Sequence, residues 1–240
     1  MLYSIIKNSA SFEELSNSLN FEDITNGRKG AVLASTKDNL IPIVRTTTKY
    51  TKPVQKFLPV HESIIKKIAS NQFNNALIEI YDNKYISMGY HSDQSLDLVE
   101  GSYICIFSCY DDPNTNCLRK LKIKEKNTEN CSELILEHNS IVLFSTGYNS
   151  KHLHKIVLEN NHNNHNTRWL GITFRLSKTF ICFINEMPYF NDNSRPLKMA
   201  NKDQIKEYYT YRSEENKRIE YKYPDIDYTI SISDTLIIEQ

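Results

Sequence analysis

The sequence predicts a mostly β protein with flanking helices (α+β), in which antiparallel strands form a sandwich or barrel. Eight short runs rich in β-forming residues follow one another between residues 76 and 176, and Asp, Asn and Gly separate them. Helical patterns lie before and after these runs, and 40% of the residues are hydrophobic, which provides a sizeable core. The predicted strands are 76–81, 86–91, 103–109, 119–124, 132–136, 140–145, 153–158 and 169–176.

Two amphipathic helices are predicted before these strands. The first covers residues 11–20, because Ser11 and Glu14 match the S-x-x-E capping box and apolar residues follow at helical spacing. The second covers residues 61–70, where isoleucines recur on one face and lysines on the other.

The remaining elements are predicted from turn residues and β-branched runs. Residues 25–30 form a turn that leads into a strand at 31–34, and residues 42–50 form a second strand that ends in a loop. After residue 186 the chain continues as a tail, with a helix over 201–216 and an edge strand over 223–232.

Composition excludes several classes of protein. The chain has 29 basic and 29 acidic residues, which argues against a strong, non-specific duplex binder, and its apolar content excludes a disordered chain. No apolar run reaches the roughly 18 residues of a membrane span. The first residues lack the features of a signal peptide. We therefore expect an intracellular protein, cytoplasmic or nuclear, that does not associate with membranes.

The five cysteines indicate reduced thiols rather than disulfides or zinc. They are odd in number and contain no C-x-x-C pair. Cys105 and Cys109 are four residues apart in a predicted strand, so both lie on one face, where packed thiols are expected.

Histidines, a carboxylate and an arginine suggest a metal centre. His91 and Asp93 are two residues apart, so in an extended strand they project to one face; a second strand carries His152 and His154, and Arg175 lies in a third. Two histidines and one carboxylate form the facial triad of non-haem Fe(II) oxygenases, which leaves positions for 2-oxoglutarate and dioxygen. Taken singly, these residues are also consistent with exposed side chains and a surface salt bridge.

A polar loop at 160–166 carries two further histidines, for which an ordinary loop is the favoured interpretation.

From Phe12 to Ser177 the chain resembles the AlkB-like branch of the Fe(II)/2-oxoglutarate dioxygenases. Members carry an F-N-x-x-L stretch, an N-x-Y and then H-x-D ten residues after that Tyr; Tyr81 and His91 keep this spacing. The segments 102–108, 149–156 and 168–175 resemble the family's Ser-ended strand, its distal histidine segment and its R-x-N-x-T-F-R motif.

The resemblance implies a double-stranded β-helix, or jelly-roll, and a set of site residues. His91, Asp93 and His154 would hold Fe(II), and Arg175 would bind the carboxylate beside the keto group of 2-oxoglutarate. Tyr81 and Arg168 would bind its distal carboxylate. It also implies a dioxygenase domain over 1–186, with a helical and substrate-lid part at 1–72, and an extension at 187–240 packed on the same domain.

Two departures from the family pattern affect the distal carboxylate. Glu79 stands where the family has Asn, and the first Arg of the motif falls one residue early, at 168, leaving Trp169 in its place. Because side chains alternate along a strand, we expect a β-bulge near Leu170–Gly171 that turns Arg168 into the site. The competing outcome is a regular strand, with Trp169 lining the pocket and another cation serving the carboxylate.

The resemblance implies oxidative demethylation of N-methylated nucleobases in DNA or RNA, with release of succinate, CO2 and formaldehyde. The base would be flipped or single-stranded, and the protein would act as a monomer. We expect the lid at 45–57 to contribute Arg45 and Tyr50 to substrate binding, whereas the basic run at 118–126 is interpreted as a solvated edge. The alternatives are the same chemistry on a protein side chain or small molecule, and a non-catalytic module that retains the barrel.

Overall fold

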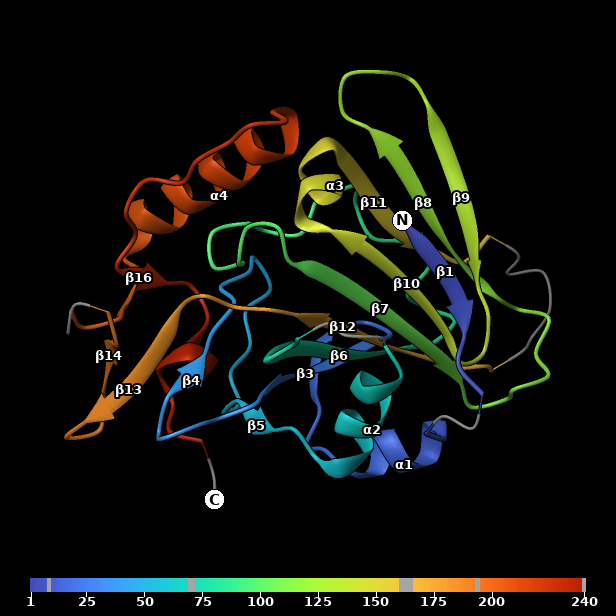
Figure 1. The fold of residues 1–240 in the computed structure, drawn as a ribbon, viewed down its shortest axis with the longest axis horizontal. Helices are drawn as coiled ribbons and strands as arrows, with labels where there is room; N and C mark the ends of the chain where they lie inside the picture. The colour runs from blue at the N-terminus through green and yellow to red at the C-terminus, as the bar shows by residue number, and fades with distance from the viewer. Residues whose placement is uncertain (8–9, 69–71, 160–165, 193–194, 239–240) are drawn as a thin grey trace.

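A large antiparallel sheet forms one wall of the molecule (Figure 1). The computed structural model describes residues 1–7, 10–68, 72–159, 166–192 and 195–238. Within them, the sheet has the order β1 (Leu2–Ile5), β10 (Ser140–Ser145), β7 (Tyr103–Tyr110), β12 (Trp169–Arg175), β6 (Asn75–Tyr81), β3 (Arg28–Ala34) and β2 (Glu22–Thr25). The short β5 (Gln55–Lys56) pairs with β3 in parallel.

A smaller sheet faces the large one and closes the core. It consists of β11 (His152–Val157), β8 (Arg119–Glu125) and β9 (Cys131–Leu136). Its Leu121, Ile123 and Ile156 are buried in one cluster with Ile106 and Val142 of the large sheet. Two facing antiparallel sheets form the jelly-roll, so the predicted fold class is confirmed.

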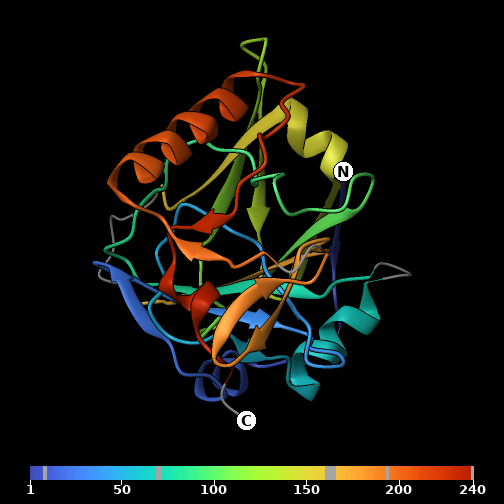
Figure 2. The same cartoon turned by 90° about the vertical axis from the view of Figure 1, so that its left-hand side faces the viewer.

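The alternation of side chains gives the large sheet two buried faces. In β6, β7 and β12, residues such as Tyr81, Ile106 and Trp169 point toward the small sheet, while Ile78 and Phe107 point to the opposite face. Two helices cover that opposite face: α1 (Phe12–Asn17) and α2 (Pro59–Lys67). Figures 1 and 2 show both helices on one side of the large sheet and α4 on the other.

The predicted capping of the first helix is present in the structure. The Ser11 hydroxyl accepts a hydrogen bond of 3.1 Å from the backbone N–H of Glu14. The two strand thiols are also as expected, since Cys105 and Cys109 are free and buried under these helices, and burial raises the pKa of the Cys109 thiol to about 12.

The remaining elements surround the ends of the two sheets. A third sheet contains β14 (Met187–Phe190), β13 (Phe180–Ile184) and β4 (Ile41–Pro42), and β15 (Lys198–Met199) pairs in parallel with β16 (Tyr228–Thr229). The helices are α3 (Thr146–Lys151), α4 (Lys202–Lys217) and the 3-10 turn η1 (Ile232–Thr235). Among the described residues, no helix has the length and apolar character needed to cross a membrane.

Several predicted elements are shorter than expected. Of the predicted 42–50 strand only Pro42 lies in a strand, at the end of β4. Of the predicted 223–232 strand only Tyr228–Thr229 pairs as a strand. Residues 86–91 contribute two isolated bridges instead of a strand. The second helix begins at Pro59 and ends at Lys67; residues 69–70 and the histidines of the 160–166 loop lie outside the described residues.

The prediction that Arg45 contacts substrate is wrong, because its side chain is buried in the core. Its guanidinium pairs with Asp97 at 2.7 Å, and its Nη1 donates to the carbonyl oxygens of Ile226 and Tyr228. This ion pair also explains why residues 42–50 leave the sheet, since the Arg45 backbone N–H donates to Asp97 rather than to a neighbouring strand. Arg45 therefore joins the N-terminal part of the chain to the C-terminal tail.

We predict that Arg45→Met destabilises the protein by about 3–5 kcal/mol, because it leaves the Asp97 carboxylate buried without its cation. Chemical denaturation at neutral pH measures this loss. Lys49→Met is the matched control: Lys49 is exposed, and its replacement should change the free energy of unfolding by less than about 0.5 kcal/mol. Equal stability of the two variants would contradict the structural role.

Candidate metal centre

Direct backbone pairing brings two histidines together. His91 and His154 face each other across an antiparallel bridge, in which the His91 N–H donates to the His154 carbonyl at 3.0 Å and the His154 N–H donates back at 2.7 Å. Their ring centroids lie 4.7 Å apart. The segment around His91 is too irregular to form a strand, but this bridge fixes it opposite β11 at His91 itself.

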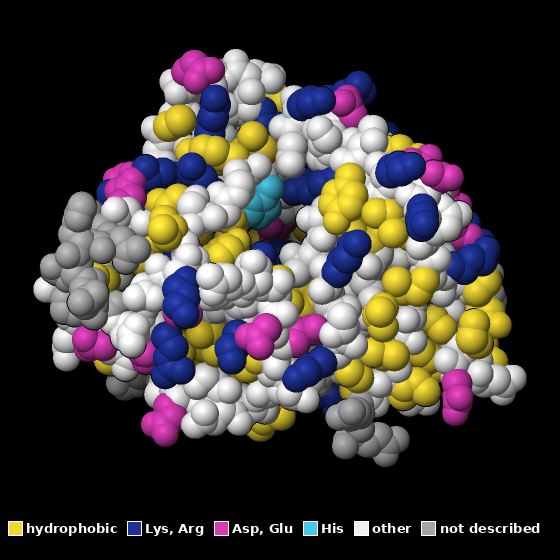
Figure 3. Space-filling view, turned by 180° about the vertical axis from the view of Figure 1, so that it is seen from behind, with side chains coloured by type: hydrophobic (Ala, Val, Ile, Leu, Met, Phe, Trp, Pro, Cys, Tyr) yellow, Lys and Arg dark blue, Asp and Glu magenta, His cyan; other side chains and the backbone are white. Residues whose placement is uncertain are grey.

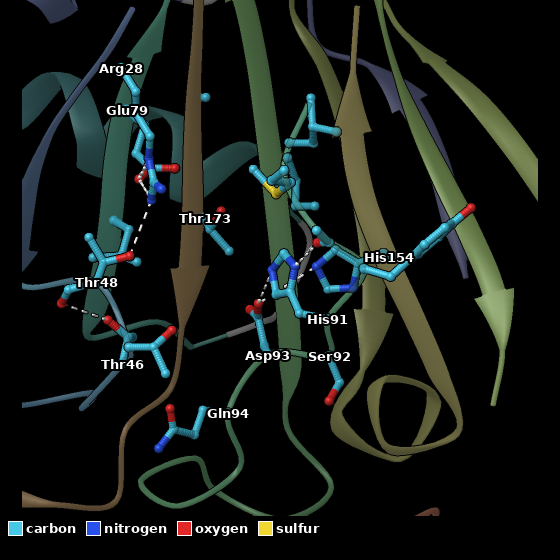
Figure 4. A pocket seen from close by; sticks show the side chains of 18 of the residues that line it. Arg28, Thr46, Thr48, Glu79, His91, Ser92, Asp93, Gln94, His154 and Thr173 are labelled. Atoms are coloured by element: carbon cyan, nitrogen blue, oxygen red, sulfur yellow. Dashed lines mark hydrogen bonds and ion pairs between the residues drawn. The ribbon is translucent and has the colours of Figure 1, made fainter. Parts of the chain in front are cut away.

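Asp93 completes the cluster from the loop that follows this bridge. Its Oδ1 lies 3.7 Å from Nε2 of His154 and 4.0 Å from Nε2 of His91, and one potential ligand atom from each residue lies within 4.8 Å of the others. Figure 4 shows the three side chains converging. The other carboxylate oxygen accepts a hydrogen bond of 2.8 Å from Nε of Arg175.

The protonation states suit a cation. Burial lowers the pKa of His154 to about 3 and also lowers the pKa of His91, so both imidazoles are neutral at pH 7. Burial opposes ionisation of Asp93, but Arg175 and the two histidines lower its pKa well below the usual range. Two neutral imidazoles and one carboxylate are the ligand set of a mononuclear Fe(II) centre.

His152, the other histidine of β11, lies outside this cluster. Its ring stacks on Tyr148 with centroids 3.8 Å apart, and its Nδ1 lies 2.9 Å from the Tyr148 carbonyl oxygen. The register taken from the family resemblance, which favours His154 over His152, agrees with this arrangement.

Helices α3 and α4 hold the loop that carries Asp93. The Asn149 side chain of α3 accepts from the Asp93 N–H and donates to the Asp93 carbonyl, both at 2.7 Å. In α4, Asn216 Oδ1 accepts from the backbone N–H of Ser92 at 3.1 Å and from its hydroxyl at 3.2 Å, and the Arg212 guanidinium donates to the Ser92 carbonyl. The C-terminal helix therefore positions the residue between two candidate metal ligands.

A cavity of about 470 Å³ opens beside the cluster. Figure 3 shows a hollow with a histidine at its edge and Lys and Arg side chains around it. The inward residues of β12, namely Trp169, Gly171, Thr173 and Arg175, line the cavity together with the candidate metal ligands. Its size lies within the range of small-molecule sites.

The predicted bulge in β12 is absent. Residues 169–175 pair in unbroken register with β6, and residues 169–174 with β7, so Trp169 faces the cavity. Arg168 points elsewhere: its side chain is 53% exposed and its Nε lies 2.8 Å from Asp111. The structure therefore contradicts the expectation that Arg168 reaches the distal carboxylate of 2-oxoglutarate.

Gly171 has a different role from the one predicted. A Cβ atom built on Gly171 would lie 1.9 Å from Cη2 of Trp169, so the missing side chain makes room for the indole ring. The glycine accommodates a neighbouring side chain rather than an irregular backbone.

At the other end of the cavity a cluster of donors surrounds Glu79. Its Oε1 accepts from Nε of Arg28 at 2.9 Å and from the Tyr50 hydroxyl at 3.1 Å, and its Oε2 accepts from the Tyr81 hydroxyl. Burial and the Glu79 charge raise the pKa values of both tyrosines, which remain donors. Sequence reasoning missed Arg28, and only the register of β3 beside β6 reveals it.

The expectation that Tyr50 stacks on a substrate is also corrected. Tyr50 is 2% exposed, and its ring packs against Gly30, where an added Cβ would lie 2.9 Å from the hydroxyl oxygen. The part of the predicted lid that lines the cavity is Thr46–Thr48.

The cavity offers donors suited to an anionic ligand. Nη1 of Arg175 is buried and has no hydrogen-bond partner among the described residues, and the same holds for Nε1 of Trp169. Leaving such donors unpaired in a buried site costs free energy, which a bound carboxylate would recover. The residues present thus fit both a metal ion and a keto-acid ligand.

Comparison with a protein-family model supports this interpretation. Residues 28–175, more than half of the chain, match a model of the 2OG-Fe(II) oxygenase superfamily. One similar solved structure is entitled "The structure of OsALKBH1"; the similarity has a TM-score of 0.39 and 14% identity, and covers 62% of this chain and 78% of that one. No curated protein sequence matches the chain significantly.

We predict that His154→Ala weakens Mn(II) binding by more than roughly 100-fold, because it removes a ligand, an effect larger than that of an outer-shell partner. His152→Ala should leave the affinity within about threefold of the wild type. Calorimetric titration of Mn(II) measures both. If His152→Ala alone abolished binding, the assignment of the ligand on β11 would be wrong.

We also predict that Asn216→Ala weakens Mn(II) binding by roughly 10-fold, because the Ser92 N–H loses its acceptor and the ligand loop loosens. Lys217→Ala, a neighbouring exposed position on α4, should leave the affinity unchanged. Unaltered Mn(II) affinity in Asn216→Ala, with lowered thermal stability, would show that α4 supports the fold but not the centre.

Proposed function

The chain belongs to the 2OG-Fe(II) oxygenase superfamily, and we propose that its centre oxidises N-methyl groups of nucleobases in DNA or RNA, in the manner of the AlkB-like branch. Membership confirms the predicted enzyme class, an Fe(II)/2-oxoglutarate-dependent dioxygenase, and its two cofactors. The substrate, the individual site residues and action as a monomer are proposals. The division at residue 186 stays a prediction.

In the proposed mechanism three protein ligands would bind Fe(II): His91, Asp93 and His154. Bound Fe(II) supplies the site at which dioxygen is reduced while 2-oxoglutarate is converted to succinate and CO2. Arg175 has two roles: its Nε fixes Asp93, and its unpaired Nη1 is available to the carboxylate beside the keto group. An N-methyl group of the base would thus be oxidised to N-hydroxymethyl, whose C–N bond breaks to release formaldehyde while the nitrogen gains a proton.

The observation that carries the substrate proposal is an aromatic–cation pair beside the centre. Tyr90 precedes His91 and lines the cavity, and Nζ of Lys155, the residue after His154, lies 4.4 Å from the Tyr90 ring centroid. An aromatic face can stack on a base, and a lysine beside it can pair with a phosphate. Thr46–Thr48 contribute neutral polar groups to the same cavity.

The basic run at 118–126 supports the view that phosphate contacts are limited. Lys120 and Lys122 of β8 pair with Glu133 and Glu159, so their charges are already balanced. A single strand or a flipped base, rather than a long duplex, is therefore the substrate form that this surface favours. The overall charge balance favours a second candidate, the same oxidation of a protein side chain or small molecule.

We predict that the enzyme releases formaldehyde from N-methylated single-stranded oligonucleotides in the presence of Fe(II) and 2-oxoglutarate. Tyr90→Ala should lower this rate by roughly 10-fold or more, as expected from the loss of about 1–3 kcal/mol of base stacking. It should spare the slow turnover of 2-oxoglutarate without substrate.

Tyr209→Ala is the matched control for this assay, since Tyr209 is an exposed tyrosine of α4 that does not line the cavity. Formaldehyde release from methylated peptides but not from any DNA or RNA oligonucleotide would contradict the nucleobase proposal and favour the second candidate.

A further inference from the structure

The cluster around Glu79 has the construction of a carboxylate-binding site. Three side chains from different segments, Arg28, Tyr50 and Tyr81, direct hydrogen bonds to one carboxylate group. Arg28, Glu79 and Tyr81 line one end of the cavity, and Tyr50 is buried behind them. Figure 4 shows Arg28 and Glu79 apart from the three candidate metal ligands, with Thr173 drawn between the two groups.

The strand register explains how the cluster is assembled. Tyr81 of β6 lies opposite Arg28 of β3 on one side and opposite Trp169 of β12 on the other. Two residues along, Glu79 lies between Gly30 and Gly171, whose missing side chains leave space for the rings of Tyr50 and Trp169. The two glycines beside Glu79 therefore make room for the two aromatic rings.

The ligand of this enzyme class needs such a site. 2-Oxoglutarate carries a carboxylate at each end: the end with the keto group belongs at the metal, beside Arg175, and the distal carboxylate requires a second cation. Among the described residues that line the cavity, the guanidinium groups belong to Arg28, Arg175 and Arg212. Arg175 is bound to Asp93, and Arg212 to Ser92 and Glu215.

Arg28 is the cation best placed for the distal carboxylate. It is a cavity residue whose only charged partner among the described residues is Glu79, an anion that lines the same cavity. Arg168 is bound to Asp111 outside the cavity, and Arg119 donates to the carbonyl oxygens of Tyr85 and Asp82. Trp169 adds a buried indole N–H that has no partner among the described residues.

We propose that Arg28 determines co-substrate specificity by binding the distal carboxylate of 2-oxoglutarate, and that Glu79 occupies Arg28 until the co-substrate takes its place. Two anions then compete for the Arg28 guanidinium and the Tyr81 hydroxyl, both of which belong to residues that line the cavity. Glu79 thus weakens the affinity for 2-oxoglutarate and keeps the buried cation paired in the free protein. This inference rests on the proposed Fe(II) site and is independent of the proposed nucleobase substrate.

The test compares two keto acids that differ only at the distal end. 2-Oxoglutarate and 2-oxopentanoate have the same length, but the second has a methyl group in place of the distal carboxylate. Their dissociation constants are measured by calorimetry with Mn(II) bound, so that no turnover is needed. The ratio of the two constants isolates the distal contact from any general loss of stability.

In the wild type, 2-oxoglutarate should bind at least 10-fold more tightly than 2-oxopentanoate. Arg28→Gln should lower this preference by roughly 10–100-fold, the range expected for a lost charge-assisted contact. Glu79→Gln should tighten 2-oxoglutarate binding several-fold and leave 2-oxopentanoate unchanged. Arg168→Gln, the matched surface arginine, should change neither constant.

Three results would overturn the proposal. An unchanged preference in Arg28→Gln would show that another group binds the distal carboxylate, and a loss of preference in Arg168→Gln would identify that group. Weaker 2-oxoglutarate binding in Glu79→Gln would show that Glu79 positions Arg28 rather than competing for it. Absence of binding of both keto acids to the Mn(II)-loaded wild type would also overturn the proposal, because it would show that no keto acid binds beside the metal.

Discussion

The buried carboxylate of Asp93 is the group on which the arrangement of the centre depends. An ionised carboxylate in this position is stable only with partners, and the structure provides Arg175 on one oxygen and two histidines near the other. The two imidazoles are brought together by a backbone bridge. Strand β12, strand β11 and the loop after His91 therefore meet at the Asp93 carboxylate. This carboxylate and the two imidazoles together form a set of ligands for a divalent cation.

The loop that carries this carboxylate is held from three directions. Asn149 binds the backbone of Asp93, α4 binds Ser92, and Arg45 with Thr179 binds Asp97 four residues later. Since Arg45 also donates to two carbonyl groups of the C-terminal tail, the tail contributes to the site without supplying a ligand. The irregular backbone at 91–97 is thereby fixed by side-chain hydrogen bonds in place of a sheet ladder.

The family resemblance was needed to choose His154 over His152 on β11. Local sequence patterns were sufficient to predict most strands of both sheets and the shared direction of His91 and Asp93. These predictions depend on alternation and on short spacings, which the chain determines locally. Arg28 could not be found in this way, because its relation to Tyr81 is set by the pairing of strands about fifty residues apart in the chain.

The incorrect predictions have a common physical cause. Gly171 was interpreted as a backbone irregularity, and Arg45 and Tyr50 as exposed groups, whereas each position is explained by a side chain that contacts it in the fold: Trp169, two residues earlier in the same strand, Asp97 and Glu79, respectively. A sequence shows which residues are charged or conformationally free, but it does not show which side chains contact them in the folded protein.

The central claim is that this chain couples Fe(II) held by the Asp93 cluster to the oxidation of 2-oxoglutarate. Its most direct test is the anaerobic loading of purified protein with Fe(II), followed by addition of 2-oxoglutarate and dioxygen and quantification of succinate. Succinate formation should require Fe(II) and should be absent in Asp93→Ala. Succinate formed equally by the wild type and by Asp93→Ala, or formed without Fe(II), would contradict it.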